Sequence, residues 1–297
     1  MNLNLSEDEK MLQALAERFV QDHYDIEKRR TYLAEPNGYS PKLWSLLSDL
    51  GLIPALFTEA DGGGDLDATG IAVVFEAMGR GLAVEPLAEN VLLAGRLFAA
   101  TADGALRDKL LPQIVEGRQR VALAHAEAKG RGGLLWVETK AEAKGADIIL
   151  TGEKAYVPAG MGADHFIVSA RTAQSSNATS GASLYLVPAN APGLTVTPWR
   201  MVDGAAAASL KLDQVKIPAA NALGGGVEAI AHAQTLANLA RAAEALGIME
   251  RIFAETSDYL RTREQFGVTL SSFQALQHRM VANYLSIEQA RALINLA

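Results

Sequence analysis

The spacing of the apolar residues changes twice along this 297-residue chain, near residues 118 and 222. Outside these points apolar side chains recur every three to four residues, the period of a helix with one buried face; between them they alternate or form short runs, the pattern of strands. Three parts follow, a helical part at 1–117, a strand part at 118–222 and a second helical part at 223–297. The sequence therefore predicts an α+β protein with helices before and after a β-domain.

Helix start signals mark the first part. Ser6 followed by Glu9 is a capping-box pattern, and the apolar residues behind it predict a helix that runs to about residue 21. Ser40 before Pro41 joins a cap residue to a first-turn proline and predicts a second helix, which Gly51 ends. A loop is expected at the three glycines of 62–64, followed by three more helices over Ile71–Met78, Ala88–Ala100 and Leu106–Val115.

The middle part carries seven short apolar runs separated by turn residues. Such a series favours an antiparallel barrel or sandwich, and Lys144–Asp147 predicts one hairpin connection. The polar stretch Ala173–Ser180 predicts an exposed loop. The expected strands contain Val121–Ala124, Trp136–Thr139, Ile148–Leu150, Phe166–Val168, Leu184–Val187, Leu194–Val196 and Leu210–Leu212.

The third part predicts two long antiparallel helices. One apolar stripe runs from Val227 to Leu260. A second covers Phe273–Leu296, with the expected inward residues Leu276, Met280, Tyr284, Ile287, Ala290 and Leu293. The helical pattern reaches residue 297 without a stop signal, so we expect the chain to be a fragment or to receive the rest of its helical bundle from elsewhere.

Composition excludes several kinds of site and partner. There is no cysteine, so disulfides, thiolate metal sites and a cysteine nucleophile are excluded, and the five histidines show no ligand-like spacing that would predict a metal site. A net charge of −7 argues against binding nucleic acid or an anionic membrane by bulk charge. No apolar run is long enough to span a bilayer, and the first residues carry no secretion signal, so a cytoplasmic location is the default expectation.

The most specific motif lies where the two C-terminal helices meet. Residues 259–267 read Tyr-Leu-Arg-Thr-Arg-Glu-Gln-Phe-Gly, and 273–277 read Phe-Gln-Ala-Leu-Gln. The Arg263 guanidinium can bind a diphosphate through two parallel hydrogen bonds, Gln265 and Gln274 can each donate and accept, and Phe266 adds a flat apolar surface. We expect Gly267 to let the chain leave the helix in a left-handed conformation. An ordinary helix C-terminus would explain each residue singly, but not the ordered string.

This string resembles the signature of the acyl-CoA dehydrogenase family, in which that corner holds FAD, and the helix–strand–helix order matches the family over the whole chain. The resemblance implies an enzyme that oxidises an acyl-CoA to its trans-2-enoyl product and passes the electrons to an acceptor protein. It places FAD, across a dimer interface, against Arg263, Gln265, Phe266, Phe273 and Gln274.

The barrel departs from the family pattern at two segments that the resemblance places near the flavin. The loop after the first strand reads His125–Gly130, in which only Glu127 clearly matches the family. The second segment reads Tyr156-Val157-Pro158, which keeps an aromatic residue but loses a hydroxyl and, at the proline, a backbone N–H. The implied cofactor contacts here are His125, Ala126, Tyr156 and Pro158.

The catalytic base is not assigned by the resemblance. In most family members a glutamate does this work in a part of the C-terminal domain beyond residue 297; the alternative position on the long helix is Ala237, which cannot take a proton. Glu244 lies two turns further along the same face and is the one nearby candidate, although a buried or interface carboxylate paired with an arginine such as Arg241 is the alternative interpretation.

The weakened barrel resembles most the small-subunit type of the family, such as the small subunit of pimeloyl-CoA dehydrogenase. The resemblance implies a homodimer or homotetramer, or a heterotetramer with a larger subunit. A non-catalytic subunit that supports assembly with a catalytic partner is therefore the second hypothesis. A purely helical scaffold would leave the order of residues around Arg263 unexplained.

Overall fold

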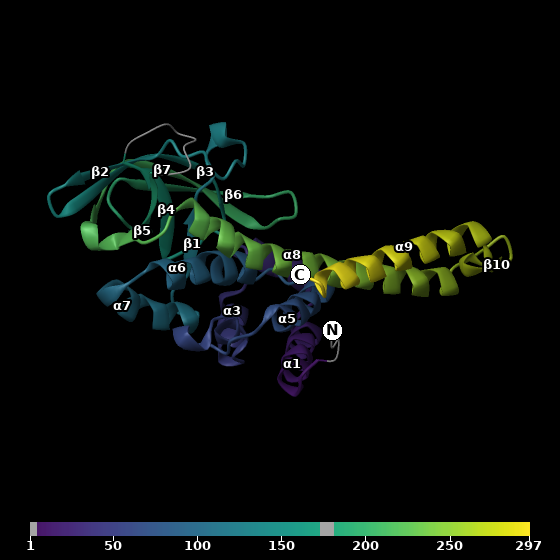
Figure 1. Ribbon diagram of the computed structural model, residues 1–297. Coiled ribbons are helices and arrows are strands. Elements are labelled where there is room, and N and C mark those ends of the chain that lie inside the picture. Colours follow the sequence, from purple (N-terminus) through teal and green to yellow (C-terminus); the bar gives the residue numbers. More distant parts are fainter. Residues whose placement is uncertain (1–4, 173–180) are drawn as a thin grey trace. The chain divides into compact units, whose positions relative to one another are not determined.

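A computed structural model describes residues 5–172 and 181–297, so the expected loop Ala173–Ser180 lies outside the described residues. The chain forms two compact units (Figure 1). The first comprises Met1–Arg29, Leu66–Ala83 and Asn238–Ala297, and the second comprises Arg30–Asp65 and Val84–Ala237. The helices of the first 117 residues are thus divided between the units, and the domain boundaries expected at residues 117 and 222 stay a prediction.

The first unit is built from long helices. Its main elements are α1 (Glu7–His23), α5 (Ala68–Gly81), most of α8 (Val227–Thr262) and α9 (Gln274–Ile294). The predicted capping box is confirmed: the Glu9 amide donates to the Ser6 hydroxyl at 3.2 Å, and the Ser6 amide donates to the Glu9 carboxylate at 2.6 Å. A further helix, α2 (Ile26–Ala34), was not expected from the sequence; it begins in the first unit and ends in the second, and none of its residues is buried.

Helices α5 and α8 approach each other closely at two glycines. A Cβ atom on Gly79 would fall well inside the van der Waals radius of the Glu244 carbonyl oxygen, and one on Gly247 would do the same to the Glu76 carbonyl oxygen. Each helix therefore presents a glycine to the backbone of the other. This reciprocal contact fixes where the two helices cross.

An ion-pair network joins four helices of the first unit. Arg80 on α5 binds Glu250 on α8 at 2.8 Å, Glu17 on α1 at 3.1 Å, and Glu76 one turn earlier on its own helix. Arg291 on α9 binds both Glu76 and Glu250. Because Glu76 is buried and Glu250 is about four-fifths buried, these pairs are screened less by solvent than surface pairs.

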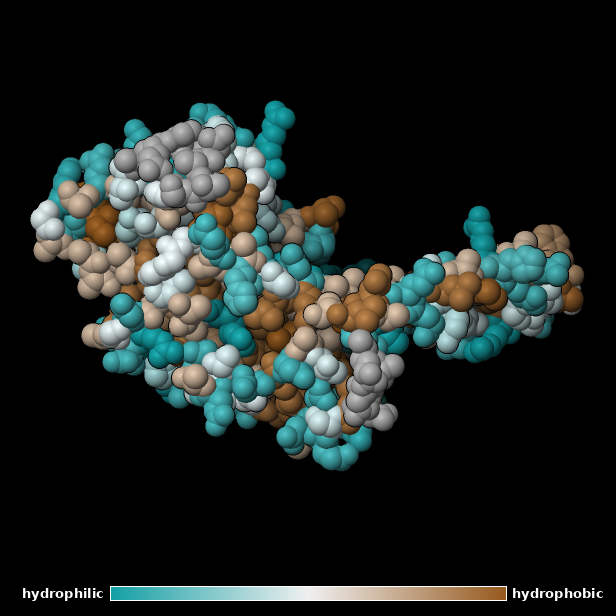
Figure 2. All heavy atoms as spheres, in the orientation of Figure 1, coloured by the Kyte–Doolittle hydropathy of each residue, from teal (hydrophilic) through white to brown (hydrophobic). Residues whose placement is uncertain are grey.

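Helix α9 runs back along α8, as predicted, with the Phe253 and Tyr284 rings 5.9 Å apart. The predicted inward face is only partly covered: Ile287 is buried, Leu276, Met280 and Ala290 are half-buried, and Tyr284 and Leu293 are exposed. A helix with one neighbouring helix can cover only part of its apolar stripe. Figure 2 accordingly shows apolar side chains among the polar ones along this hairpin; they include Ile252, Tyr259, Phe266, Val281, Tyr284, Leu285 and Leu293.

Short helices begin the second unit. They are α3 (Pro41–Asp49), α4 (Leu52–Ala55), α6 (Arg96–Thr101) and α7 (Gly104–Val115). Ser40 caps α3, and Gly51 follows it with a φ of 78°, as the sequence predicts. The single helix expected over Ala88–Ala100 is instead a π-helix over Leu87–Gly95 that continues into α6. Here the buried Asn90 side chain donates to the Val121 carbonyl at 2.7 Å and ties this helix to the first strand.

The rest of the second unit is an eight-stranded sheet that curves around its own core (Figure 1). Most strand pairs are antiparallel, as predicted, and the expected hairpin is confirmed by the pairing of Lys144 with Asp147. Two pairings, β1 with β4 and β2 with β4, are parallel. The strands are β1 (Val121–Ala124), β2 (Lys140–Lys144), β3 (Asp147–Pro158), β4 (His165–Arg171), β5 (Ala182–Pro188), β6 (Leu194–Arg200), β7 (Ala206–Pro218) and β8 (Ala222–Leu223).

One expected strand is wrong. Residues Trp136–Thr139 belong to no strand, and the sheet position next to β3 is taken by the following residues, β2. The backbone of 136–139 is instead bound by the side chains of Glu127, which follows β1, and of Arg171 on β4, and by the backbone of residues 133 and 171. An alternating apolar pattern shows which residues face inward but not which partner satisfies the backbone.

Candidate functional site

The corner that follows α8 is a β-hairpin. The helix ends at Thr262, and β9 (Glu264–Gln265) pairs with β10 (Val268–Thr269) in antiparallel fashion. Phe266 and Gly267 form the two-residue turn, with φ of 57° and 78°. The left-handed conformation expected for Gly267 is therefore present, but it closes this hairpin and does not cap the helix. A turn with both central residues at positive φ matches the twist of the strands.

The hairpin brings the predicted cofactor residues into one corner. Arg263, Gln265, Phe266 and Gln274 are exposed, and Phe273 is half-buried with its ring 6.2 Å from that of Phe266 in an edge-to-face contact. The Leu270 amide donates to the Arg263 carbonyl, and the Phe273 amide donates to the Leu270 carbonyl, which joins the two sides of the corner. A guanidinium, two side-chain amides and an aromatic pair are thus carried by the hairpin and by the residues that lead into α9.

The two predicted segments of the barrel also lie side by side. Ala126 forms an isolated antiparallel bridge with Tyr156, and the Ala155 amide donates to the Ala126 carbonyl at 2.9 Å. Tyr156 is 39% exposed, and its ring lies 5.8 Å from that of Trp199. Pro158, two residues further along β3, is half-buried. We define Ala126 and Tyr156 as the barrel rim.

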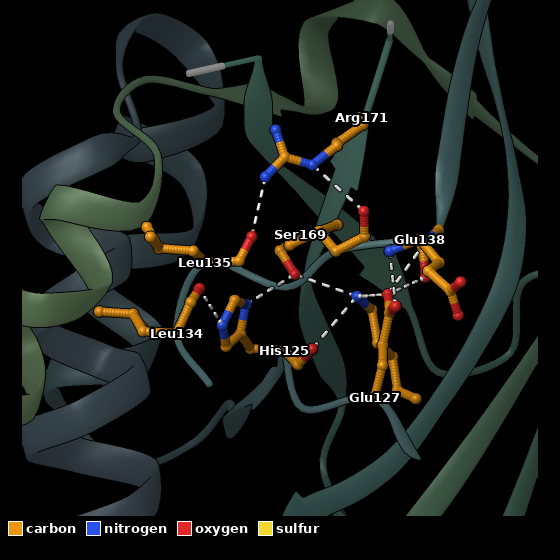
Figure 3. A network of polar contacts seen from close by, with 10 residues as sticks. His125, Glu127, Leu134, Leu135, Glu138, Ser169 and Arg171 are labelled. Atoms are coloured by element: carbon orange, nitrogen blue, oxygen red, sulfur yellow. Dashed lines mark hydrogen bonds and ion pairs between the residues drawn. The ribbon is translucent and has the colours of Figure 1, made fainter. Parts of the chain in front are cut away.

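His125 behaves differently from its neighbour Ala126. Its side chain is 7% exposed, with Nδ1 2.9 Å from the Ser169 hydroxyl and Nε2 2.9 Å from the Leu134 carbonyl (Figure 3). Burial, and then the charge of Lys154, lower the pKa of His125 to about 4, so the ring is neutral at pH 7. Both ring nitrogens form hydrogen bonds inside the barrel. The His125 side chain therefore contributes to a ligand site at the barrel rim only by holding the backbone next to Ala126.

Lys154 and Glu127 form a buried ion pair beneath the rim. The Lys154 ammonium lies 2.7 Å from the Glu127 carboxylate, and their side chains are 0% and 4% exposed. Burial alone would raise the pKa of Glu127, but Lys154 and the hydrogen bonds from Thr139 and the Glu138 amide lower it. Burial lowers the pKa of Lys154 to about 8 against the opposing effect of Glu127. Both groups are therefore charged at neutral pH.

Three family models match the chain in order: the acyl-CoA dehydrogenase N-terminal domain over residues 6–118, the middle domain over 122–215 and the C-terminal domain over 224–297. Cyclohexane-1-carbonyl-CoA dehydrogenase from Geobacter metallireducens is 31% identical to the chain over 259 residues, which cover 84% of the chain and 67% of that relative. The chain belongs to the acyl-CoA dehydrogenase family. The family and fold expected from the motif at residues 259–277 are confirmed.

Other members of the acyl-CoA dehydrogenase family extend the comparison. Acyl-CoA dehydrogenase FadE27 from Mycobacterium tuberculosis is 31% identical over 253 residues, which cover 85% of the chain but only 65% of that relative. The ChsE4–ChsE5 complex from the same organism has a chain with a TM-score of 0.87 and 29% identity, covering 99% of this chain and 78% of its own length. The chain thus spans about two thirds to four fifths of these relatives' lengths.

The candidate base positions lie on α8. Ala237 is fully buried, and Glu244 is half-buried two turns further along the helix.

Among residues 5–172 and 181–297, no group of acidic and histidine side chains is arranged to hold a metal ion. In the same ranges, no helix has both the length and the apolar character needed to cross a membrane.

Sequence reasoning missed the interior of the barrel. Lys154, Ser169 and Arg171 are buried polar residues with several partners each, yet none was expected to contribute to a site. Strand alternation held a signal for Lys154, because Leu150, four residues earlier on the same strand, is buried and Lys154 pairs with the buried Leu210. A lysine at an inward position of a strand requires an acidic partner, and Glu127 supplies it.

Proposed function

We propose that this chain is a FAD-dependent acyl-CoA dehydrogenase that oxidises an acyl-CoA thioester to the trans-2-enoyl product. The observation that carries the proposal is the ordered match of three family models, combined with an exposed corner that presents Arg263, Gln265 and Gln274 together. The substrate, the electron-accepting partner and the cofactor all belong to this proposal.

The residues present fit the parts of FAD. The Arg263 guanidinium and the amides of Gln265 and Gln274 match a diphosphate, because they offer planar, multiple donors. Phe266 adds an apolar surface beside them. On the barrel, the buried indole N–H of Trp136 has no acceptor among the described residues, which leaves a donor for a ligand to complete. Bound FAD supplies the acceptor for the hydride that leaves the β-carbon of the thioester.

The removal of the α-proton needs a base. Ala237 has no titratable group, so within α8 the proposal assigns this role to Glu244, whose carboxylate would hold the proton. Replacing Glu244 with glutamine should abolish dye reduction by acyl-CoA and leave flavin content unchanged. Wild-type turnover by the Glu244→Gln variant would remove Glu244 from this role.

The first experiment is the absorbance spectrum of the purified chain with and without added FAD. We expect a flavin spectrum; a colourless protein that takes up no FAD would contradict the proposal.

The Arg263→Ala variant should weaken FAD binding by about tenfold or more, because hydrogen bonds from a charged group are lost. Arg261→Ala is the matched control, since Arg261 is also exposed, lies two residues away, and pairs with Asp258 at 3.2 Å.

The second candidate function is a non-catalytic subunit that keeps the fold for assembly with a catalytic partner. The buried Ala237 at one base position favours it, and the ChsE4–ChsE5 complex supports it as an example of two different chains assembled in one structure. We propose a homodimer or homotetramer for the enzyme and a heterotetramer with a larger subunit for the alternative. Dye reduction by the isolated chain with acyl-CoA at ordinary enzyme rates would reject the alternative.

A further inference from the structure

The segment Leu134–Thr139, which we call the tethered segment, is held to the barrel mainly by side chains (Figure 3). Arg171 donates to the Leu135 carbonyl at 2.8 Å and to the Val137 carbonyl at 3.1 Å. The Glu127 carboxylate accepts from the Glu138 amide at 2.6 Å and from the Thr139 amide at 3.0 Å. With the Leu134 carbonyl bound to His125, five backbone groups of the tethered segment depend on three side chains.

Lys154 is the hub of these contacts. Its ammonium donates to the Glu127 carboxylate at 2.7 Å, to the Ser169 hydroxyl at 3.0 Å and to the His125 carbonyl at 3.3 Å. All three ammonium protons are therefore used. Because the side chain is fully buried, each of these contacts is made in a medium of low dielectric constant, where it is stronger than in water.

The hydrogen bonds of the hub have one consistent direction. The Leu134 carbonyl can only accept, so His125 carries its proton on Nε2 and its Nδ1 must accept from the Ser169 hydroxyl. The Ser169 oxygen then accepts from Lys154. The charge of Lys154 thus orients the Ser169 hydroxyl and the His125 ring, and through them the start of the tethered segment.

The hub lies directly behind the barrel rim. His125 and Glu127 flank Ala126 in the sequence, and Lys154 is two residues before Tyr156. Inward side chains on both sides of Ala126 fix its backbone, which forms the bridge with Tyr156. The same side chains therefore hold both the barrel rim and the tethered segment.

We propose that Lys154 is a positioning residue for cofactor binding, one that never touches the cofactor and acts by holding the barrel rim and the tethered segment through Glu127, Ser169 and His125. The inference rests on the proposed function, because it takes the rim as part of the FAD site. Removing the ammonium leaves the Glu127 carboxylate buried without its cation, which is unfavourable. The carboxylate is then expected to move toward solvent, away from the Glu138 and Thr139 amides.

The experiment combines hydrogen exchange of the cofactor-free chain with FAD titration, both well below the melting temperature. In Lys154→Met we expect exchange of the Glu138 and Thr139 amides to rise, and FAD affinity to fall, by about tenfold or more as the charge-assisted bonds are lost. Lys216→Met is the matched control, an exposed lysine on β7 paired with Asp147 at 2.7 Å, and should change neither. A role in stability alone would lower the melting temperature and leave FAD affinity unchanged.

A second variant keeps the test decisive if Lys154→Met does not fold. The pair Lys154→Met with Glu127→Gln removes both charges and retains one acceptor oxygen, which serves one of the two segment amides, so its stability should recover in part. Its FAD affinity should stay about tenfold or more below wild type, because Ser169 and His125 have lost their orienting donor. Wild-type affinity in either variant would overturn the inference and leave the proposed function standing. A wild-type chain that binds no FAD would overturn both.

Discussion

His125 shows how a single buried side chain ties stability to pH. Burial and Lys154 lower its pKa to about 4 in the folded chain, from 6.5 in the unfolded chain. Between these two values the unfolded chain binds the proton and the folded chain does not. Acidification from pH 6.5 to pH 4 therefore lowers the free energy of unfolding. Above pH 6.5 this loss of stability is absent, because His125 is neutral in both states.

We predict that the free energy of unfolding falls by up to about 3 kcal/mol between pH 6.5 and pH 4 as a result of His125. Chemical denaturation at several pH values measures it. His125→Asn should be less stable at pH 7, because the Leu134 carbonyl and Ser169 lose a partner, but its stability should depend less on pH. His278→Asn, at an exposed position on α9, should keep the wild-type slope. An unchanged slope in the His125 variant would contradict the prediction.

At the scale of elements, the crossing of α5 and α8 sets two effects against each other at Gly247. Alanine is about 1 kcal/mol better than glycine in a helix interior. Here, however, its Cβ would overlap the Glu76 carbonyl oxygen, an atom of the helix backbone that cannot turn aside as a side chain can. The helices would have to separate. This would also disturb the Arg80–Glu250 ion pair, because that pair joins the same two helices.

We predict that Gly247→Ala destabilises the chain by about 3 kcal/mol, at the upper end of overpacking costs. Ala245→Gly, on the exposed side of the same turn, is the comparison and should cost about 1 kcal/mol from helix propensity alone. Denaturant unfolding measures both. A Gly247→Ala variant as stable as wild type would mean that the two helices can part freely.

Local signals in the sequence predicted most of the helices and strands. Contacts between residues far apart in the sequence were not predicted. The caps at Ser6 and Ser40 and the long helix α8 depend on neighbouring residues, and the structure confirms them. Trp136–Thr139 alternates like a strand, but three of its backbone groups bind the side chains of residues 127 and 171, which no local pattern reveals. The order of residues 259–277 predicted the turn at Arg263 between the two C-terminal helices. The role of Lys154 inside the barrel was not predicted, because a lysine in a strand usually faces solvent.

At the scale of the whole molecule, the proposed cofactor residues fall into two groups. Arg263 and its neighbours belong to the first compact unit, and Tyr156 on the barrel rim belongs to the second. The expectation that FAD is held across a dimer interface means that one chain supplies the corner and its partner supplies the rim. In a symmetric dimer each of the two sites would then contain one group from each chain.

Intersubunit complementation tests this arrangement. Arg263→Ala and Tyr156→Ala should each bind FAD weakly alone, the first through loss of the guanidinium and the second through loss of the aromatic ring. In a mixed dimer one site carries both substitutions and the other carries neither, so random co-assembly should restore about a quarter of the wild-type sites. Co-expression with two affinity tags and flavin quantification measures the restored fraction. If the mixed dimer forms but restores no sites, the corner and the rim must serve the cofactor within one chain, because only then does every site keep a defect.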